Sequence, residues 1–190
     1  MLNKIGEPMK KFILGLCLLF TAQVAVATDC PELTISQKVN MLKAYNYGEN
    51  KMGKGWGITL AAIALQESEL GLNLENRKTH DYGIFQNHLK TVVKRNKVNP
   101  NVARKKLIRD FQYAAQETHK ELEFWTKVHG TPKGKKSLKK VLASYNAGYN
   151  YSIPKARQYS KDVYNNMQVL AQCEFATNIQ KVKHERIKSI

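Results

Sequence analysis

Glu67 is the residue whose chemistry follows most directly from its neighbours. Leu60, Ile63, Ala64 and Glu67 fall at positions i, i+3, i+4 and i+7, so they share one face of a helix. A carboxyl group at the end of an apolar stripe is desolvated, which raises its pKa and favours the protonated form near neutral pH. Such a group can donate a proton to a glycosidic oxygen. The alternative is an exposed acidic helix end, which describes neighbouring Glu69 better.

A second candidate is the amide side chain of Gln86, in the segment 82–86 (YGIFQ). A glycine before two apolar residues and a glutamine fits a tight turn that presents one side chain. Glutamine both donates and accepts hydrogen bonds, which suits a sugar hydroxyl or acetamide group. A half-buried strand explains this segment equally well.

The third candidate is Tyr145, in the segment 143–148 (ASYNAG). Helical spacing from Leu138, Val141 and Leu142 places Tyr145 on the core side of its helix, near the helix end. Its hydroxyl could therefore reach a cleft, although a tyrosine buried for packing is common. Asn146 and the following glycine also fit an ordinary helix C-cap.

Taken together, the three segments resemble the Slt-type lytic transglycosylases. Residues 67–71 (ESELG) match the E-S-x-x-G motif of that family, residues 83–86 (GIFQ) resemble G-L-M-Q, and residues 144–148 (SYNAG) resemble A-Y-N-A-G. The order and the spacing of the motifs agree with the family, and the resemblance covers roughly residues 36–148. The preceding Asp81-Tyr82 pair is similar to the branch that accompanies secretion machines, conjugation systems and some phages.

The resemblance implies a mainly α, lysozyme-like (goose-type or Slt-type) single domain with a short non-helical or β-hairpin insertion. It implies that Glu67 acts first as acid and then as base on the MurNAc-GlcNAc β-1,4 bond of peptidoglycan. The substrate's N-acetyl group would stabilise the oxocarbenium-like state, and its own O6 hydroxyl would attack to form 1,6-anhydro-MurNAc. No metal or other cofactor is implied.

Site roles are carried over by position in the three motifs. The resemblance implies that Ser68 orients Glu67, that Gln86 contacts the substrate and that Tyr145 lies close to the reaction centre. We group Ser68, Tyr82 and Asn146 with Gln86 and Tyr145 as substrate-binding candidates, and Asn146 also fits structural support.

One departure from the family and one further carboxylate keep alternatives open. The family often continues Gln-Ile-Asn, whereas this chain has Gln86-Asn87-His88. Asp81 is a possible second carboxylate, and a position facing Glu67 across a cleft would favour a hydrolytic muramidase. A further alternative is a non-catalytic protein with the same fold, which binds peptidoglycan and serves in assembly.

The net charge of +16 raises a different possibility, a nucleic-acid binder. No nucleic-acid recognition motif is visible, and an export signal argues against that function. We therefore expect peptidoglycan glycan strands as the partner of a monomeric protein, with an envelope-spanning secretion or conjugation machine as a further partner.

The elements that must position these residues are mostly helical. Apolar periodicity and Gly or Pro breaks predict helices over 36–47, 56–69, 101–128 and 137–146, and from Pro154 toward Ala171. Residues 72–92 are polar and turn-rich, which favours a short hairpin or an irregular loop.

The N-terminus has the three parts of a secretory signal peptide. Met9-Lys10-Lys11 precedes an apolar run over 12–20, and the stretch 24–27 ends in small residues. We expect cleavage after Ala27 and a periplasmic location, with an uncleaved anchor as the alternative. The predicted organisation is a signal peptide over 1–27, a domain over 28–175 and a basic tail over 176–190.

Cysteine usage agrees with export. Cys17 lies in the signal, which leaves Cys30 and Cys173 as an even pair at opposite ends of the mature domain. An oxidising compartment would let them form a disulfide, which would stabilise the fold by about 4 kcal/mol. Two unrelated buried thiols are the alternative.

Overall fold

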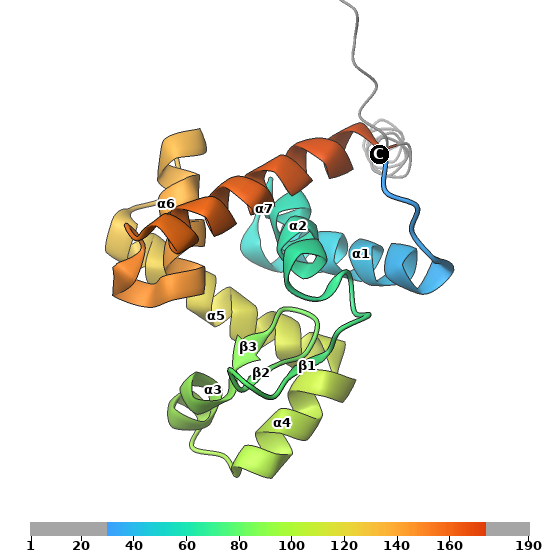
Figure 1. The fold of residues 1–190 in the computed structure, drawn as a ribbon, viewed down its shortest axis with the longest axis vertical. Helices are drawn as coiled ribbons and strands as arrows, with labels where there is room; N and C mark the ends of the chain where they lie inside the picture. The colour runs from blue at the N-terminus through green and yellow to red at the C-terminus, as the bar shows by residue number, and fades with distance from the viewer. Residues whose placement is uncertain (1–29, 174–190) are drawn as a thin grey trace, which may run out of the picture.

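The computed structural model describes residues 30–173, which form a mainly helical structure with a small antiparallel sheet (Figure 1). This architecture confirms the expected mainly α class with a short β insertion. The predicted signal peptide over 1–27 and basic tail over 176–190 lie outside the described residues. Within the described range, no helix is long and apolar enough to cross a membrane.

Most of the chain is helical, and the strands are only two residues long. The helical elements are α1 (Ile35–Tyr47), the π-helix η1 (Gly48–Met52), α2 (Trp56–Ser68), α3 (Leu89–Asn96), α4 (Pro100–Arg109), α5 (Phe111–His129), α6 (Lys135–Ala147), the 3₁₀-helix η2 (Gly148–Asn150) and α7 (Pro154–Gln172). The strands are β1 (Glu75–Asn76), β2 (Asp81–Tyr82) and β3 (Asn87–His88). The helices predicted at 36–47, 56–69 and 137–146, and after Pro154, are confirmed to within a few residues.

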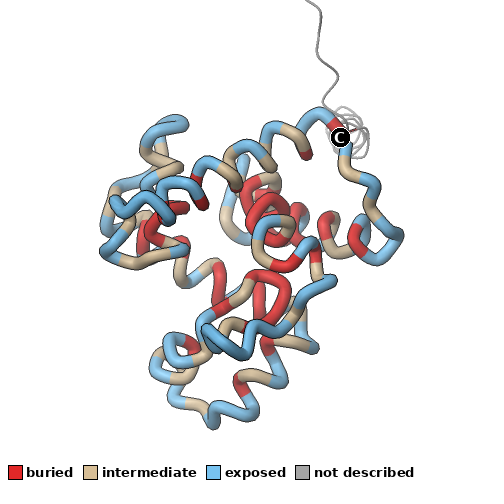
Figure 2. Tube along the Cα trace, in the orientation of Figure 1, coloured by how far each residue is buried: buried red, intermediate tan, exposed pale blue. Residues whose placement is uncertain are grey.

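The core is built around α2, which contacts both α1 and α7. Every residue of α2 from Thr59 to Ala64 is buried, and Figure 2 shows this helix as the buried centre of its half of the molecule. An apolar surface on all sides is expected of a helix that is covered all round. The position of α2 is therefore set by packing on several sides.

The prediction of one long helix over 101–128 is wrong in one respect, because the helix is interrupted at Asp110. This residue has an extended backbone, with φ −115° and ψ 99°, between α4 and α5. Its side chain accepts a hydrogen bond from the backbone N–H of Tyr113 at 3.0 Å, which caps the start of α5. The cap stabilises a new helix start where periodicity alone predicted continuity.

The polar segment after α2 forms a three-stranded antiparallel sheet in the order β1-β2-β3. Glu75 pairs with Tyr82, and Tyr82 pairs in turn with Asn87. The sequence predicted a hairpin or an irregular loop here, and the sheet extends the hairpin by one strand. The sheet joins α2 to α3 and α4, in the lower half of the view in Figure 1.

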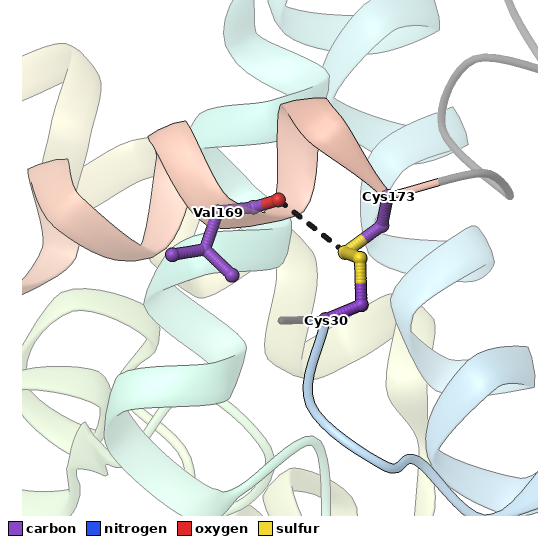
Figure 3. Close-up of a disulfide and its surroundings, with 3 residues drawn as sticks. All are labelled: Cys30, Val169 and Cys173. Atoms are coloured by element: carbon purple, nitrogen blue, oxygen red, sulfur yellow. Dashed lines mark hydrogen bonds between the residues drawn. A yellow bond between two sulfur atoms is a disulfide. The ribbon is translucent and has the colours of Figure 1, made fainter. Parts of the chain in front are cut away.

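Cys30 and Cys173 form a disulfide with a Cα–Cα distance of 5.6 Å, as the sequence predicted. The bond joins the segment before α1 to the end of α7 (Figure 3), across a sequence separation of 143 residues. The Cys173 sulfur also lies 3.3 Å from the carbonyl oxygen of Val169 in the last turn of α7. Both ends of the described chain are thus held beside the helices that surround α2.

Candidate active site

The end of α2 that carries Glu67 is held in place by α1. After Ser68 the backbone turns through two left-handed residues, Glu69 with φ 51° and Leu70 with φ 58°. The side-chain amide of Gln37 donates to the Glu69 carbonyl at 3.0 Å, and that of Asn40 donates to the Leu70 carbonyl at 2.9 Å. These bonds satisfy carbonyl groups in the turn that follows the helix.

Glu67 is half-buried as a residue, and its carboxyl group accepts a hydrogen bond from the hydroxyl of Tyr159 on α7, at 2.6 Å. The pKa of Glu67 is raised to about 7, most of all by burial, while the hydrogen bond from Tyr159 lowers this pKa and the charge of Asp81 adds to the rise. Burial is the largest of the three effects because it penalises the charged form. Glu67 can therefore exchange a proton near neutral pH, as a general acid and base must.

Glu67 opens onto a cleft of about 500 Å³, between the sheet with α3 on one side and α5 with α6 on the other. Four of the predicted site residues line this cleft: Glu67, Gln86, Tyr145 and Asn146. Asp81, the possible second carboxylate, lines it too. The fold thus brings the three motifs to one cavity, although they lie far apart in the sequence.

The loop that carries Gln86 depends on Gly83, which has φ 84°. A Cβ atom at this position would lie 2.2 Å from the carbonyl oxygen of Leu107, so only glycine fits. Gln86 itself has φ 48°, and its side-chain amide donates to the carbonyls of Gly83 at 2.8 Å and Asn73 at 3.2 Å. The amide nitrogen is thereby committed to the loop, which leaves the side-chain oxygen as the group able to meet a ligand.

Tyr145 on α6 connects two of the motifs. Its hydroxyl donates to the Phe85 carbonyl at 2.7 Å and lies 3.5 Å from the Thr118 hydroxyl. Burial raises the pKa of Tyr145 well above its ordinary value, and the charge of Glu67 adds to this effect. Tyr145 therefore stays neutral and holds the backbone beside Gln86 in place.

Ser68 and Tyr82 do not line the cleft. The Ser68 side chain is 1% exposed, and its hydroxyl donates to the Ile84 carbonyl at 2.7 Å and accepts from the Gly71 N–H at 2.9 Å. Tyr82 is also buried, with the guanidinium group of Arg104 5.5 Å from its ring centre. Both residues hold the walls of the site in place, so the expectation of direct substrate contact is corrected for them.

Sequence reasoning missed Tyr159, which is the direct partner of Glu67. Tyr159 lies on the buried face of α7 with Ala156 and Val163, so its spacing predicts packing and nothing more. Burial raises the pKa of Tyr159 well above its ordinary value, and the charge of Glu67 adds to the rise. Its hydroxyl therefore stays protonated and donates a hydrogen bond to Oε1 of Glu67.

A group of polar residues in the cleft wall was also missed. The Arg95 guanidinium bonds to the carboxylates of Glu117, at 3.2 Å, and Glu121. Glu117 is 1% exposed and also bonds to Lys120, at 2.6 Å, while Glu121 accepts from the indole N–H of Trp125 at 2.8 Å. Arg95, Glu121 and Trp125 line the cleft. Glu121 and Trp125 are four residues apart on α5, whereas only tertiary packing brings Arg95 of α3 to them.

The fold and the site define a mainly helical protein in which the carboxyl group of the half-buried Glu67 lies at the wall of a polar cleft. No family model matches the chain, and no solved structure matches it. The chain is 34% identical over 141 residues to the uncharacterized 20.7 kDa protein in the vs-regB intergenic region of Enterobacteria phage T4, covering 65% of this chain and 74% of the phage protein. The chain belongs to the same family as that phage protein.

Proposed function

We propose that this protein is a peptidoglycan lytic transglycosylase with a lysozyme-like fold, and that Glu67 is its single acid/base. The observation that carries the proposal is the state of Glu67, which is held by Tyr159 and has a pKa of about 7 at the wall of a cleft. Gln86 and Tyr145 of the other two motifs line the same cleft as Glu67. The arrangement suits proton transfer to a glycan.

The hydrogen bond from Tyr159 assigns different tasks to the two oxygens of Glu67. Oε1 accepts from the Tyr159 hydroxyl, and no hydrogen bond to Oε2 occurs among residues 30–173. In the protonated acid, Oε2 therefore carries the proton that is given to the glycosidic oxygen as the bond from that oxygen to C1 of MurNAc breaks. Tyr159 then stabilises the carboxylate that this step leaves behind.

In the second step, Glu67 acts as base and closes the cycle. The carboxylate takes the proton of the MurNAc C6 hydroxyl while O6 forms a bond to C1. The substrate's acetamido group supports the positive charge at C1 between the two steps. The reaction consumes no water, returns Glu67 to its protonated form and leaves a 1,6-anhydro-MurNAc end.

The products of peptidoglycan digestion test this proposal. Purified sacculi are incubated with the protein, and the soluble muropeptides are analysed by mass spectrometry. We expect anhydro-muropeptides that are one water lighter than lysozyme products, and we expect Glu67→Gln to release none. A fully active Glu67→Gln protein would remove Glu67 from the mechanism.

A hydrolytic muramidase is the second candidate, because Asp81 lines the same cleft as Glu67. The charge of Asp81 raises the pKa of Glu67, so the two carboxyl groups interact. One carboxylate oxygen of Asp81, Oδ1, already lies 3.0 Å from Nδ1 of His88. Products with only reducing ends, together with loss of activity in Asp81→Asn, would favour hydrolysis over transglycosylation.

The proposal extends to the setting of the enzyme. We propose that the protein is an exported, periplasmic monomer that acts on glycan strands. We further propose that it works together with an envelope-spanning secretion or conjugation machine. The cystine between Cys30 and Cys173 supports export, because such bonds persist in oxidising compartments. Cell fractionation tests this, and recovery of the unprocessed chain in the cytoplasm would contradict it.

A further inference from the structure

The cleft can enclose only a short stretch of a polymer. A volume of about 500 Å³ lies within the range of cavities that bury small-molecule ligands. A longer glycan strand must therefore continue over the surface on leaving the cleft. The residues next to the cleft wall decide whether that continuation is bound.

An aromatic group lies beside one part of this wall. Trp125 lines the cleft and is 4% exposed, and its indole N–H is fixed by Glu121 at 2.8 Å. His129 stacks against Trp125, with ring centres 6.0 Å apart. The rings of Tyr149 and Trp125 form a T-shaped pair, with ring centres 5.1 Å apart and an interplanar angle of 79°.

Tyr149 is a large aromatic residue that stays mostly exposed to solvent. Its relative exposure is 72%, although its ring touches a nearly buried tryptophan. It follows Gly148, which lines the cleft, and it lies in the short 3₁₀-helix η2 after α6. The T-shaped contact holds the ring in a defined orientation and leaves much of its surface in water.

We propose that Tyr149 is a stacking platform for a sugar ring of the strand beyond the cleft, an inference that rests on the proposed function. The C–H groups of a pyranose ring carry partial positive charge, and the face of an aromatic ring carries partial negative charge. Removing both surfaces from water adds a hydrophobic contribution. Tyr149 thus makes the protein prefer longer β-1,4-linked glycans to short ones.

Binding of chito-oligosaccharides of two lengths tests the platform. The trimer and the hexamer are titrated into the full-length Glu67→Gln protein, which cannot turn them over, and tryptophan fluorescence or calorimetry gives the affinities. Tyr149→Ala should weaken binding of the hexamer about three- to tenfold, the effect of losing one aromatic contact, and leave the trimer unchanged.

Two further variants separate stacking from other effects. Tyr149→Phe keeps the ring and should bind the hexamer as well as the parent protein does. Phe124→Ala removes another exposed ring, which lies on α5 and is 45% exposed. The rings of Phe124 and Trp125 also form a T-shaped pair, with ring centres 4.8 Å apart. This control should leave both affinities unchanged.

The outcome for wild-type cleavage of sacculi distinguishes two kinds of failure. If the wild-type protein releases anhydro-muropeptides and Tyr149→Ala binds the hexamer normally, the platform is disproved and the proposed function stands. If Phe124→Ala weakens the hexamer as much as Tyr149→Ala, the effect is not specific to Tyr149 and the platform is again disproved. If the wild-type protein cleaves no sacculi, the proposed function fails.

Discussion

The hydroxyl group of Tyr159 donates a 2.6 Å hydrogen bond to Oε1 of Glu67, across 92 positions of sequence. The bond connects α7 to the end of α2, two helices that pack against each other. It stabilises the charged form of Glu67, whereas burial and the charge of Asp81 stabilise the protonated form. The pKa of about 7 is the balance of these effects.

The first prediction concerns the pH dependence of cleavage. A general acid must be protonated, so kcat/KM should fall as pH rises through about 7. Tyr159→Phe removes an effect that lowers the pKa of Glu67, so the falling limb should move to higher pH. Asp81→Asn removes an effect that raises this pKa, so the limb should move to lower pH. Shifts in the same direction would contradict the assignment.

The second prediction concerns stability. The pKa of Glu67 is raised in the folded protein, so its contribution to stability is fully present below pH 4.5 and is lost as pH rises through about 7. Glu67→Gln should therefore increase the free energy of unfolding by about 1–3 kcal/mol at pH 8. The difference should vanish near pH 4.

Urea unfolding at the two pH values measures this effect. The exposed Glu69, two residues further along, provides the control, and Glu69→Gln should not show the same dependence on pH. Equal stabilisation by Glu67→Gln at both pH values would show that the buried charge is not its cause.

The third prediction concerns the loop that presents Gln86. Gly83→Ala places a methyl group 2.2 Å from the Leu107 carbonyl oxygen, at a φ of 84°. We expect a loss of about 2–4 kcal/mol of stability and a marked loss of cleavage, because the loop must shift. Gly134 has an extended backbone, and the methyl group of Gly134→Ala would project into open space. This variant should therefore keep both its stability and its cleavage activity. A stable, active Gly83→Ala protein would contradict the close approach.

The fourth prediction concerns the bond between Cys30 and Cys173. Because it closes a loop of 143 residues in sequence, its reduction should lower the free energy of unfolding by about 4–5 kcal/mol. Urea unfolding with and without a reductant measures the difference. The Cys30→Ser, Cys173→Ser protein should match the reduced wild type and should not respond to reductant. An unchanged midpoint on reduction of the wild type would contradict the prediction.

Local sequence patterns were sufficient for much of the helical structure. The apolar run of α2 and the spacing of apolar residues in α6 predicted both helices, because burial of one helix face repeats at a period that can be counted. The same spacing placed Glu67 at the end of a buried helix. The pairing of Cys30 with Cys173 followed from an even number of cysteines after the predicted signal peptide.

Tertiary structure alone decided which side chains act together. The periodicity of α7 marks Tyr159 as buried, but only the packing of α7 on α2 brings its hydroxyl to Glu67. The buried hydroxyl of Ser68 bonds to the Ile84 carbonyl, although the sequence had placed this serine among the substrate-binding candidates. Periodicity reports which face of a helix is buried, whereas the partner on that face is set by long-range packing, which leaves no local trace in the sequence.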